Sequence, residues 1–165
     1  MIHADNYPIH CWTGEIDGRS KVANIYMTSH ITRLYGARNL YGFSAAPGSF
    51  RSPNLQQHCS PEEVHMMDTD PRLQVYFYNY EQACATAVYG AVAQEPLDVI
   101  RKRQDSGGKG EEGSSTGLYL EGSAVAGPTP KDAEISLEYG HAEWAFDAKK
   151  EAELWEASQK LVGTA

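Results

Sequence analysis

The spacing of apolar residues predicts a long helix near the start of the chain and a buried strand after it. Between Gly18 and Tyr35, apolar residues recur mainly at intervals of three and four, at Val22, Ile25, Met27, Ile31 and Leu34. This period is that of an amphipathic helix, and Gly36 follows where such a helix would end. The run from Leu40 to Ala46 is apolar and aromatic and is closed by a Pro-Gly pair. It predicts a buried strand that runs into a loop.

Capping patterns predict two helices in the middle of the chain. Ser60 stands three residues before Glu63 and directly before a proline, which is typical of a helix start and predicts a helix over residues 61–67. Asn79 is the expected cap of the next helix, because a glutamine follows it three residues later. That helix is rich in alanine over residues 83–93, so it can approach a neighbour closely.

The last third of the chain predicts a loop, a strand and a terminal helix. Residues 101–117 are rich in glycine, serine and charge, which indicates a flexible surface loop. Residues 118–126 are expected to form a strand. The terminal helix is predicted to run from Asp147, its cap, to Val162 and to turn toward the core Leu154, Trp155, Leu161 and Val162.

Composition and charge restrict the classes of protein to which the chain can belong. Its 165 residues are 41% hydrophobic and 22% charged, which fits a single globular domain over residues 1–165. The formal net charge of −8 repels phosphate backbones, so nucleic acid is not an expected partner. The longest run without a charge or amide, residues 83–93, is about half the length that a membrane-crossing helix needs. No membrane segment is therefore expected.

The cysteines and the first residues bear on the compartment. Cys11, Cys59 and Cys84 are odd in number and far apart, so we expect neither a disulfide framework nor a metal-binding CxxC motif. The start of the chain has neither the basic nor the apolar segment of a secretory signal. A reducing, cytoplasmic location is the resulting expectation.

Several segments follow one another in an order that is typical of a known family. Arg19 to Ile25 reads RSKVANI. The further segments are the strand from Leu40 to Ala46, the Pro47-Gly48 loop with Arg51, Ser52 and Leu55 to His58, the stretch from Gly117 to Pro128, and Trp144 to Asp147. In this order they resemble the C-terminal half of the short-chain dehydrogenases/reductases (SDRs), most closely the filamentous-fungal type. RSKVANI is similar to the helix that carries the lysine of the family's YxxxK motif, and the resemblance covers nearly the whole chain, from about Asn6 to the end.

This resemblance implies an α/β fold that is rich in helix: a partial Rossmann-like fold with few strands and flanking helices. No Gly-rich turn follows a first strand, so no nucleotide-binding half is recognisable and no cofactor is expected. Two strands that are buried on both faces in the parent fold cannot cover the helices by themselves. The resemblance therefore implies a homodimer that completes the fold.

The main departure from the family lies at its proton donor. The tyrosine that stands four residues before the lysine in the family is replaced here by Asp17, whereas Lys21 is retained. An aspartate and a lysine four residues apart on a helix most commonly form a surface ion pair. Their inherited position also allows a second interpretation, in which the carboxylate replaces the phenol as general acid or base.

Other candidate residues come from the loop that covers the substrate in the family and from the aromatic residues near it. His58 is a further proton-transfer candidate, because histidine titrates near neutral pH, although a solvated loop residue is the alternative. The candidates for substrate binding are Arg51, Ser52, Tyr76, Tyr78, Trp12 and His10. The aromatic residues among them can equally be core packing. The histidines have no ligand spacing, and no metal site is predicted.

Two functional hypotheses from different classes follow. The first is a cofactor-independent cyclase or isomerase that acts on a small hydrophobic biosynthetic intermediate, such as a polyketide, terpenoid or alkaloid. The second is a non-catalytic SDR pseudoenzyme or partner subunit. A less favoured third hypothesis is an NAD(P)-dependent oxidoreductase whose cofactor site is rebuilt across a dimer.

Overall fold

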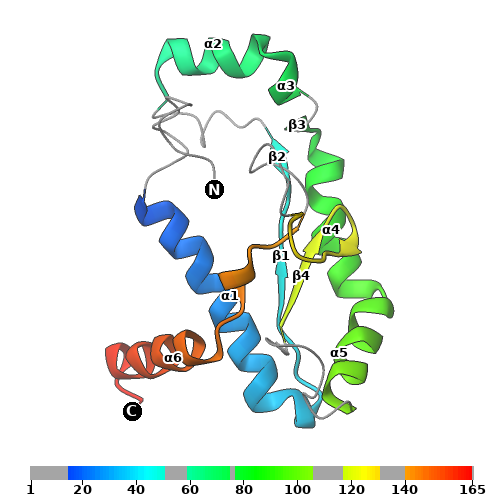
Figure 1. Cartoon of the computed structure of the whole chain (residues 1–165), viewed down its shortest axis with the longest axis vertical. Helices are drawn as coiled ribbons and strands as arrows, with labels where there is room; N and C mark the ends of the chain where they lie inside the picture. Colours follow the sequence, from blue (N-terminus) through cyan, green and yellow to red (C-terminus); the bar gives the residue numbers. More distant parts are fainter. Residues whose placement is uncertain (1–14, 51–58, 75–76, 106–116, 131–139, 165) are drawn as a thin grey trace.

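The computed structural model describes residues 15–50, 59–74, 77–105, 117–130 and 140–164, and shows small parallel strands flanked by helices (Figure 1). Its helices are α1 (Glu15–Tyr35), α2 (Pro61–Thr69), α3 (Pro71–Gln74), α4 (Tyr80–Val92), α5 (Glu95–Asp105) and α6 (Ala148–Val162). Its strands are β1 (Phe43–Ala45), β2 (Ser49–Phe50), β3 (Phe77–Tyr78), β4 (Leu118–Glu121) and β5 (Ala124–Val125).

The main sheet is mixed and has the strand order β1-β4-β5. β1 and β4 are parallel, with Ser44 opposite Tyr119, and β4 and β5 are antiparallel. β2 and β3 form a second, parallel pair. Figure 1 shows α1 on one side of β1 and β4, and α4 and α5 on the other. This helix-rich α/β arrangement is the predicted one and corresponds to part of a Rossmann-like fold.

The hydrophobic core lies between the sheet and α5. Ile100, Leu118 and Leu120 are fully buried, and Tyr41, Phe43, Tyr89, Val99 and Val125 pack against them. Leu118 and Leu120 share one face of β4 because side chains alternate along a strand. That alternation turns Tyr119 and Glu121 toward the opposite face, on the side of α1.

The capping predictions are confirmed by hydrogen bonds at the helix starts. The Glu63 N–H donates to Ser60 Oγ, and the Ser60 N–H donates to the Glu63 carboxylate. The same reciprocal pair joins Asn79 and Gln82 at the start of α4. Asp147 caps α6 by accepting the backbone N–H groups of Lys149 and Lys150.

Several sequence predictions need correction. The loop expected over residues 101–117 starts later, because α5 continues to Asp105; residues 106–116 lie outside the described part of the chain. Acidic residues in the first turn of α5 and basic residues in its last turn complement the helix dipole, and this favours the longer helix. The strand expected over residues 118–126 is a hairpin, because Gly122 and Ser123 have positive φ and form a turn between β4 and β5.

The end of α6 also differs from the prediction. Leu154 and Trp155 are half-buried, as expected, but Leu161 and Val162 are 88% and 72% exposed. α6 crosses α1, and its last turn extends beyond this contact (Figure 1). The helical period therefore identifies the face of α6 that packs on α1, but it does not show at which residue this contact ends.

Cys59 is disulfide-bonded, so the expectation of no disulfide is wrong. Cys84 is a free and exposed thiol. Sequence separation does not show which cysteines approach each other in space with the geometry that a disulfide needs. Because Cys59 is bonded, the number and spacing of the cysteines no longer argue for a reducing compartment. The cytoplasmic location stays a prediction.

Candidate functional site

Side-chain hydroxyls fix α1 against β1. Thr32 Oγ1 accepts the Gly42 N–H at 2.8 Å, and the hydroxyls of Thr28 and Ser44 lie 2.8 Å apart. Gly42 permits this close approach, because a Cβ at that position would lie 2.7 Å from the Thr28 carbonyl oxygen. The two contacts also show that α1 and β1 run in opposite directions, since a lower residue number on α1 meets a higher one on β1.

This geometry places Lys21 beyond the carboxyl end of β1. Lys21 precedes Thr28 by about two helical turns, or about 10 Å along α1. The carboxyl end of β1 leads into Pro47 and Gly48 at the same end of the sheet. In α/β folds, ligands bind outside the carboxyl ends of parallel strands. The candidate functional site is therefore this end of the sheet, between the first turns of α1 and the Pro47-Gly48 turn.

Gly48 packs directly against Tyr78, which the sequence analysis places among the substrate-binding candidates. The φ of Gly48 is 71°, and a Cβ there would clash with two atoms of the Tyr78 ring. The parallel pairing of β2 with β3 brings Tyr78 to this turn, and Tyr78 is half-buried. The Tyr78 ring thus forms one side of the turn that follows β1.

Most of the other predicted site residues lie outside the described residues: His58, Arg51, Ser52, Tyr76, Trp12 and His10. Lys21 is exposed on α1. The backbone of Asp17 belongs to the same helix and lies one turn before Lys21, which places both residues on one face of α1. Of the predicted site residues, Lys21 and Tyr78 are those that the structure describes with their side chains, both at elements next to the candidate site.

The structure adds three titratable residues that the sequence analysis did not single out. Glu121 ends β4, and its carboxylate accepts the Gly140 N–H at 2.8 Å. Burial raises the pKa of Glu121, although the Gly140 hydrogen bond opposes this shift. Burial also raises the pKa of Tyr119, and the nearby Glu121 charge raises it further. The His141 ring packs edge-on against Tyr119. A carboxylate at the end of a buried strand was the signal that could have revealed Glu121.

The described residues contain neither a candidate metal site nor a candidate membrane-spanning helix. In the parts of the chain that the structure describes, no three His, Cys, Asp or Glu side chains are grouped so that they could hold a metal ion. Within the same residues, no helix combines the length and apolarity needed to cross a membrane.

Comparisons with known proteins identify relatives among fungal oxidoreductases. The chain is 32% identical over 145 residues to "Short-chain dehydrogenase/reductase prx1" of Penicillium roqueforti and to the protein of the same name from Penicillium rubens. It is 28% identical over 149 residues to "Oxidoreductase calI" of Penicillium decumbens. The chain is related to the SDRs. Each alignment covers 88% of the chain, which confirms that the SDR-like sequence extends over most of its length.

The SDR-like chain spans little more than a third of these relatives, 37% of prx1 and 38% of calI. No family model matches the chain. No solved structure matches it either. The relationship therefore rests on the curated relatives.

Proposed function

We propose that the chain forms the substrate-binding part of a tailoring enzyme and catalyses a redox-neutral cyclisation or isomerisation of a small hydrophobic biosynthetic intermediate. The observation that carries the proposal is the register of α1 against β1. The Thr28–Ser44 contact orients α1 so that Lys21 lies beyond the carboxyl end of β1. Asp17 precedes Lys21 by one turn, at the position where the SDR motif has its proton-donating tyrosine.

Such a reaction needs an acid or base next to an apolar, shaped surface. Asp17 and Lys21 would transfer the proton, with His58 as a further candidate. The aromatic ring of Tyr78, which packs on Gly48, would contact the substrate. The remaining substrate-binding candidates are Arg51, Ser52, Tyr76, Trp12 and His10.

A proton-transfer assay tests this proposal. The purified chain is incubated in D2O with 2-tetralone, a hydrophobic cyclic ketone, and deuterium incorporation next to the carbonyl is followed by NMR. We expect exchange above the buffer rate, and we expect Asp17→Asn or Lys21→Met to remove most of it. Glu153→Gln and Lys149→Met are matched controls, because both residues are exposed on α6 and away from β1. Equal exchange in all four variants would contradict the roles of Asp17 and Lys21.

The oxidoreductase names of the relatives favour a second candidate function, NAD(P)-dependent hydride transfer with a cofactor site completed across a dimer. Calorimetric titration with NADPH and NADH separates the two functions. Redox-neutral chemistry predicts no saturable binding up to millimolar nucleotide. Micromolar binding would instead support the oxidoreductase.

The non-catalytic alternative, a pseudoenzyme or partner subunit, makes a different prediction. It predicts no proton transfer on the ketone and a stable complex with an SDR partner that supplies further strands. A chain that catalyses exchange alone, with sensitivity to Asp17→Asn, would exclude it.

A further inference from the structure

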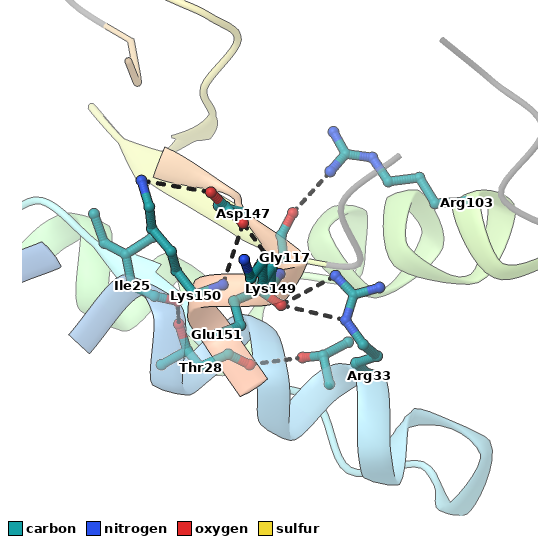
Figure 2. Close-up of polar contacts among 10 residues, drawn as sticks. Ile25, Thr28, Arg33, Arg103, Gly117, Asp147, Lys149, Lys150 and Glu151 are labelled. Carbon is teal, nitrogen blue, oxygen red and sulfur yellow. Dashed lines mark hydrogen bonds and ion pairs between the residues drawn. The ribbon is translucent and has the colours of Figure 1, made fainter. Parts of the chain in front are cut away.

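Two buried polar side chains meet where α6 crosses α1. Glu151 on α6 is fully buried, and one of its carboxylate oxygens accepts the Arg33 Nε–H and Nη2–H groups at 3.2 and 3.0 Å (Figure 2). Its other oxygen has no hydrogen-bond partner among the described residues. His30 lies one turn before Arg33 on α1, is buried, and its Nδ1 also lacks a partner in that part of the chain.

Aromatic rings of α1 and α6 also pack together at this crossing. The His30 and Trp155 ring centroids are 5.4 Å apart, and the Tyr35 ring meets the edge of Trp155. Since Glu151 and Trp155 are four residues apart on α6, they present one face of that helix to α1. The docked position of α6 thus keeps the His30 ring away from water.

The charges around His30 determine how the junction responds to acid. Burial is the largest influence and lowers the pKa of His30 below its usual value of 6.5. The Arg33 charge lowers this pKa further, whereas the Glu151 charge opposes the shift. The other charged residues of α6 point away from the junction or cap the helix. Asp147 is the cap, and the exposed residues are Lys149, Lys150, Glu153, Glu156 and Lys160.

We propose that the α1–α6 junction is an acid-sensitive latch, in which protonation of His30 weakens the docking of α6. A docked α6 requires neutral His30, because burial disfavours the charged imidazolium more than the Glu151 charge favours it. When α6 is released, the His30 ring contacts water and its pKa returns to the usual value of 6.5. The free energy of docking is therefore complete above about pH 6.5 and is lost as the pH falls below that value.

The N-terminal cap of α6 does not produce the same response in this pH range. The backbone N–H of Lys150 is the main cause of the lowered pKa of Asp147, and hydrogen bonding and charge from Lys150 and Lys149 add to it. Asp147 therefore keeps its charge between pH 7.5 and pH 5, and the cap remains intact. This property separates the His30 latch from fraying at the helix start.

Hydrogen exchange measured by mass spectrometry on the whole chain tests the proposal at pH 7.5 and pH 5, after correction for intrinsic exchange rates. We expect amides of α6 to lose protection at pH 5, while amides of α4 keep theirs. His30→Gln, which cannot carry the charge, should keep α6 protected at both pH values. His65→Gln is the matched control, because His65 is exposed on α2, and it should behave as the unmodified chain does.

Two results would overturn the latch: unchanged α6 protection between the two pH values in the unmodified chain, or an equal loss in His30→Gln. If His30→Gln does not fold, His30→Phe provides a second neutral ring that can pack on Trp155, with the same expected result. Tryptophan fluorescence gives an independent signal, because release of α6 exposes the Trp155 ring to water and shifts its emission to longer wavelength. We expect this shift on acidification of the unmodified chain and no such shift in His30→Phe.

Discussion

At the scale of single residues, Glu151 shows how a buried charge can hold two helices together. Its carboxylate is fully buried and bonds Arg33, whose side chain is partly exposed (Figure 2). Removing the charge weakens two charge-assisted hydrogen bonds, which contribute more than neutral ones. We expect Glu151→Gln to lower the free energy of unfolding by about 1–3 kcal/mol, measured by urea denaturation.

Lys149→Gln is the control for this prediction. Lys149 pairs with Glu153 at 3.8 Å, and both side chains are largely exposed. Exposed pairs of this kind contribute less than about 1 kcal/mol, so the change should be small. An equal loss in the two variants would argue that the Arg33–Glu151 contact stabilises the fold no more than an exposed ion pair does.

Gly48 is the second residue with a testable role, at the turn next to the candidate site. Alanine there would meet the Tyr78 ring and would also have to adopt a φ of 71°. We expect Gly48→Ala to lower the free energy of unfolding by at least about 1 kcal/mol, in a denaturation experiment. The double variant Gly48→Ala, Tyr78→Ala should recover the steric part of this loss and keep the backbone strain.

Gly127 is a matched position for this test, because an added Cβ would meet no atom within 4 Å and no unusual φ is required. Gly127→Ala should change stability by less than about 0.5 kcal/mol. A comparable loss at both glycines would show that the Gly48–Tyr78 packing has no special role.

At the scale of elements, hydrogen bonds within four residues define the helix starts. Asn79 and Gln82 exchange bonds at the start of α4, the helix that packs on β1 and β4. Removal of such a cap typically costs about 1 kcal/mol. We expect Asn79→Ala to lower the free energy of unfolding by about that amount and to increase hydrogen exchange in the first turn of α4.

Cys84→Ala supplies the comparison for Asn79→Ala, since Cys84 is exposed in the interior of α4. It should leave the exchange of the first turn unchanged. If both variants have the same effect, the loss comes from the helix as a whole rather than from its cap.

At the scale of the whole molecule, the small sheet and the exposed apolar residues favour self-association. Within the described residues, β1 pairs with β4 and with no strand on its other side. Leu34, on the helix that carries Lys21, is 45% exposed. We expect light scattering at micromolar concentration to give twice the mass of one chain, because a dimer would cover these surfaces.

A charge on α1 tests which surface is involved. Leu34→Glu should shift the protein toward monomer, whereas Val92→Glu, at an exposed position on α4, should leave the dimer intact. A stable monomer in the unmodified chain would contradict the predicted homodimer. The reverse result in the two variants would move the interface to α4.

Local sequence signals identify only part of the candidate site. Lys21 and Tyr78 lie at the carboxyl end of β1, but the sequence could not show the Gly48–Tyr78 contact, because β2 and β3 pair across a long stretch of chain. Glu121 was missed for a related reason. Its raised pKa arises from burial by the fold and not from its neighbours in sequence.

Side-chain period and capping patterns were enough to predict the long first helix and the capped starts of α2, α4 and α6, because they depend on residues only three or four positions apart. The helix-rich α/β class followed instead from the resemblance of several ordered motifs to the SDRs. The tertiary structure alone decided the parallel pairing of β1 with β4, the division of residues 118–126 into a hairpin, and the exposure of the end of α6. It also brought together Arg33 and Glu151, 118 residues apart. Such contacts depend on how elements approach in space, and neither period nor capping encodes that approach.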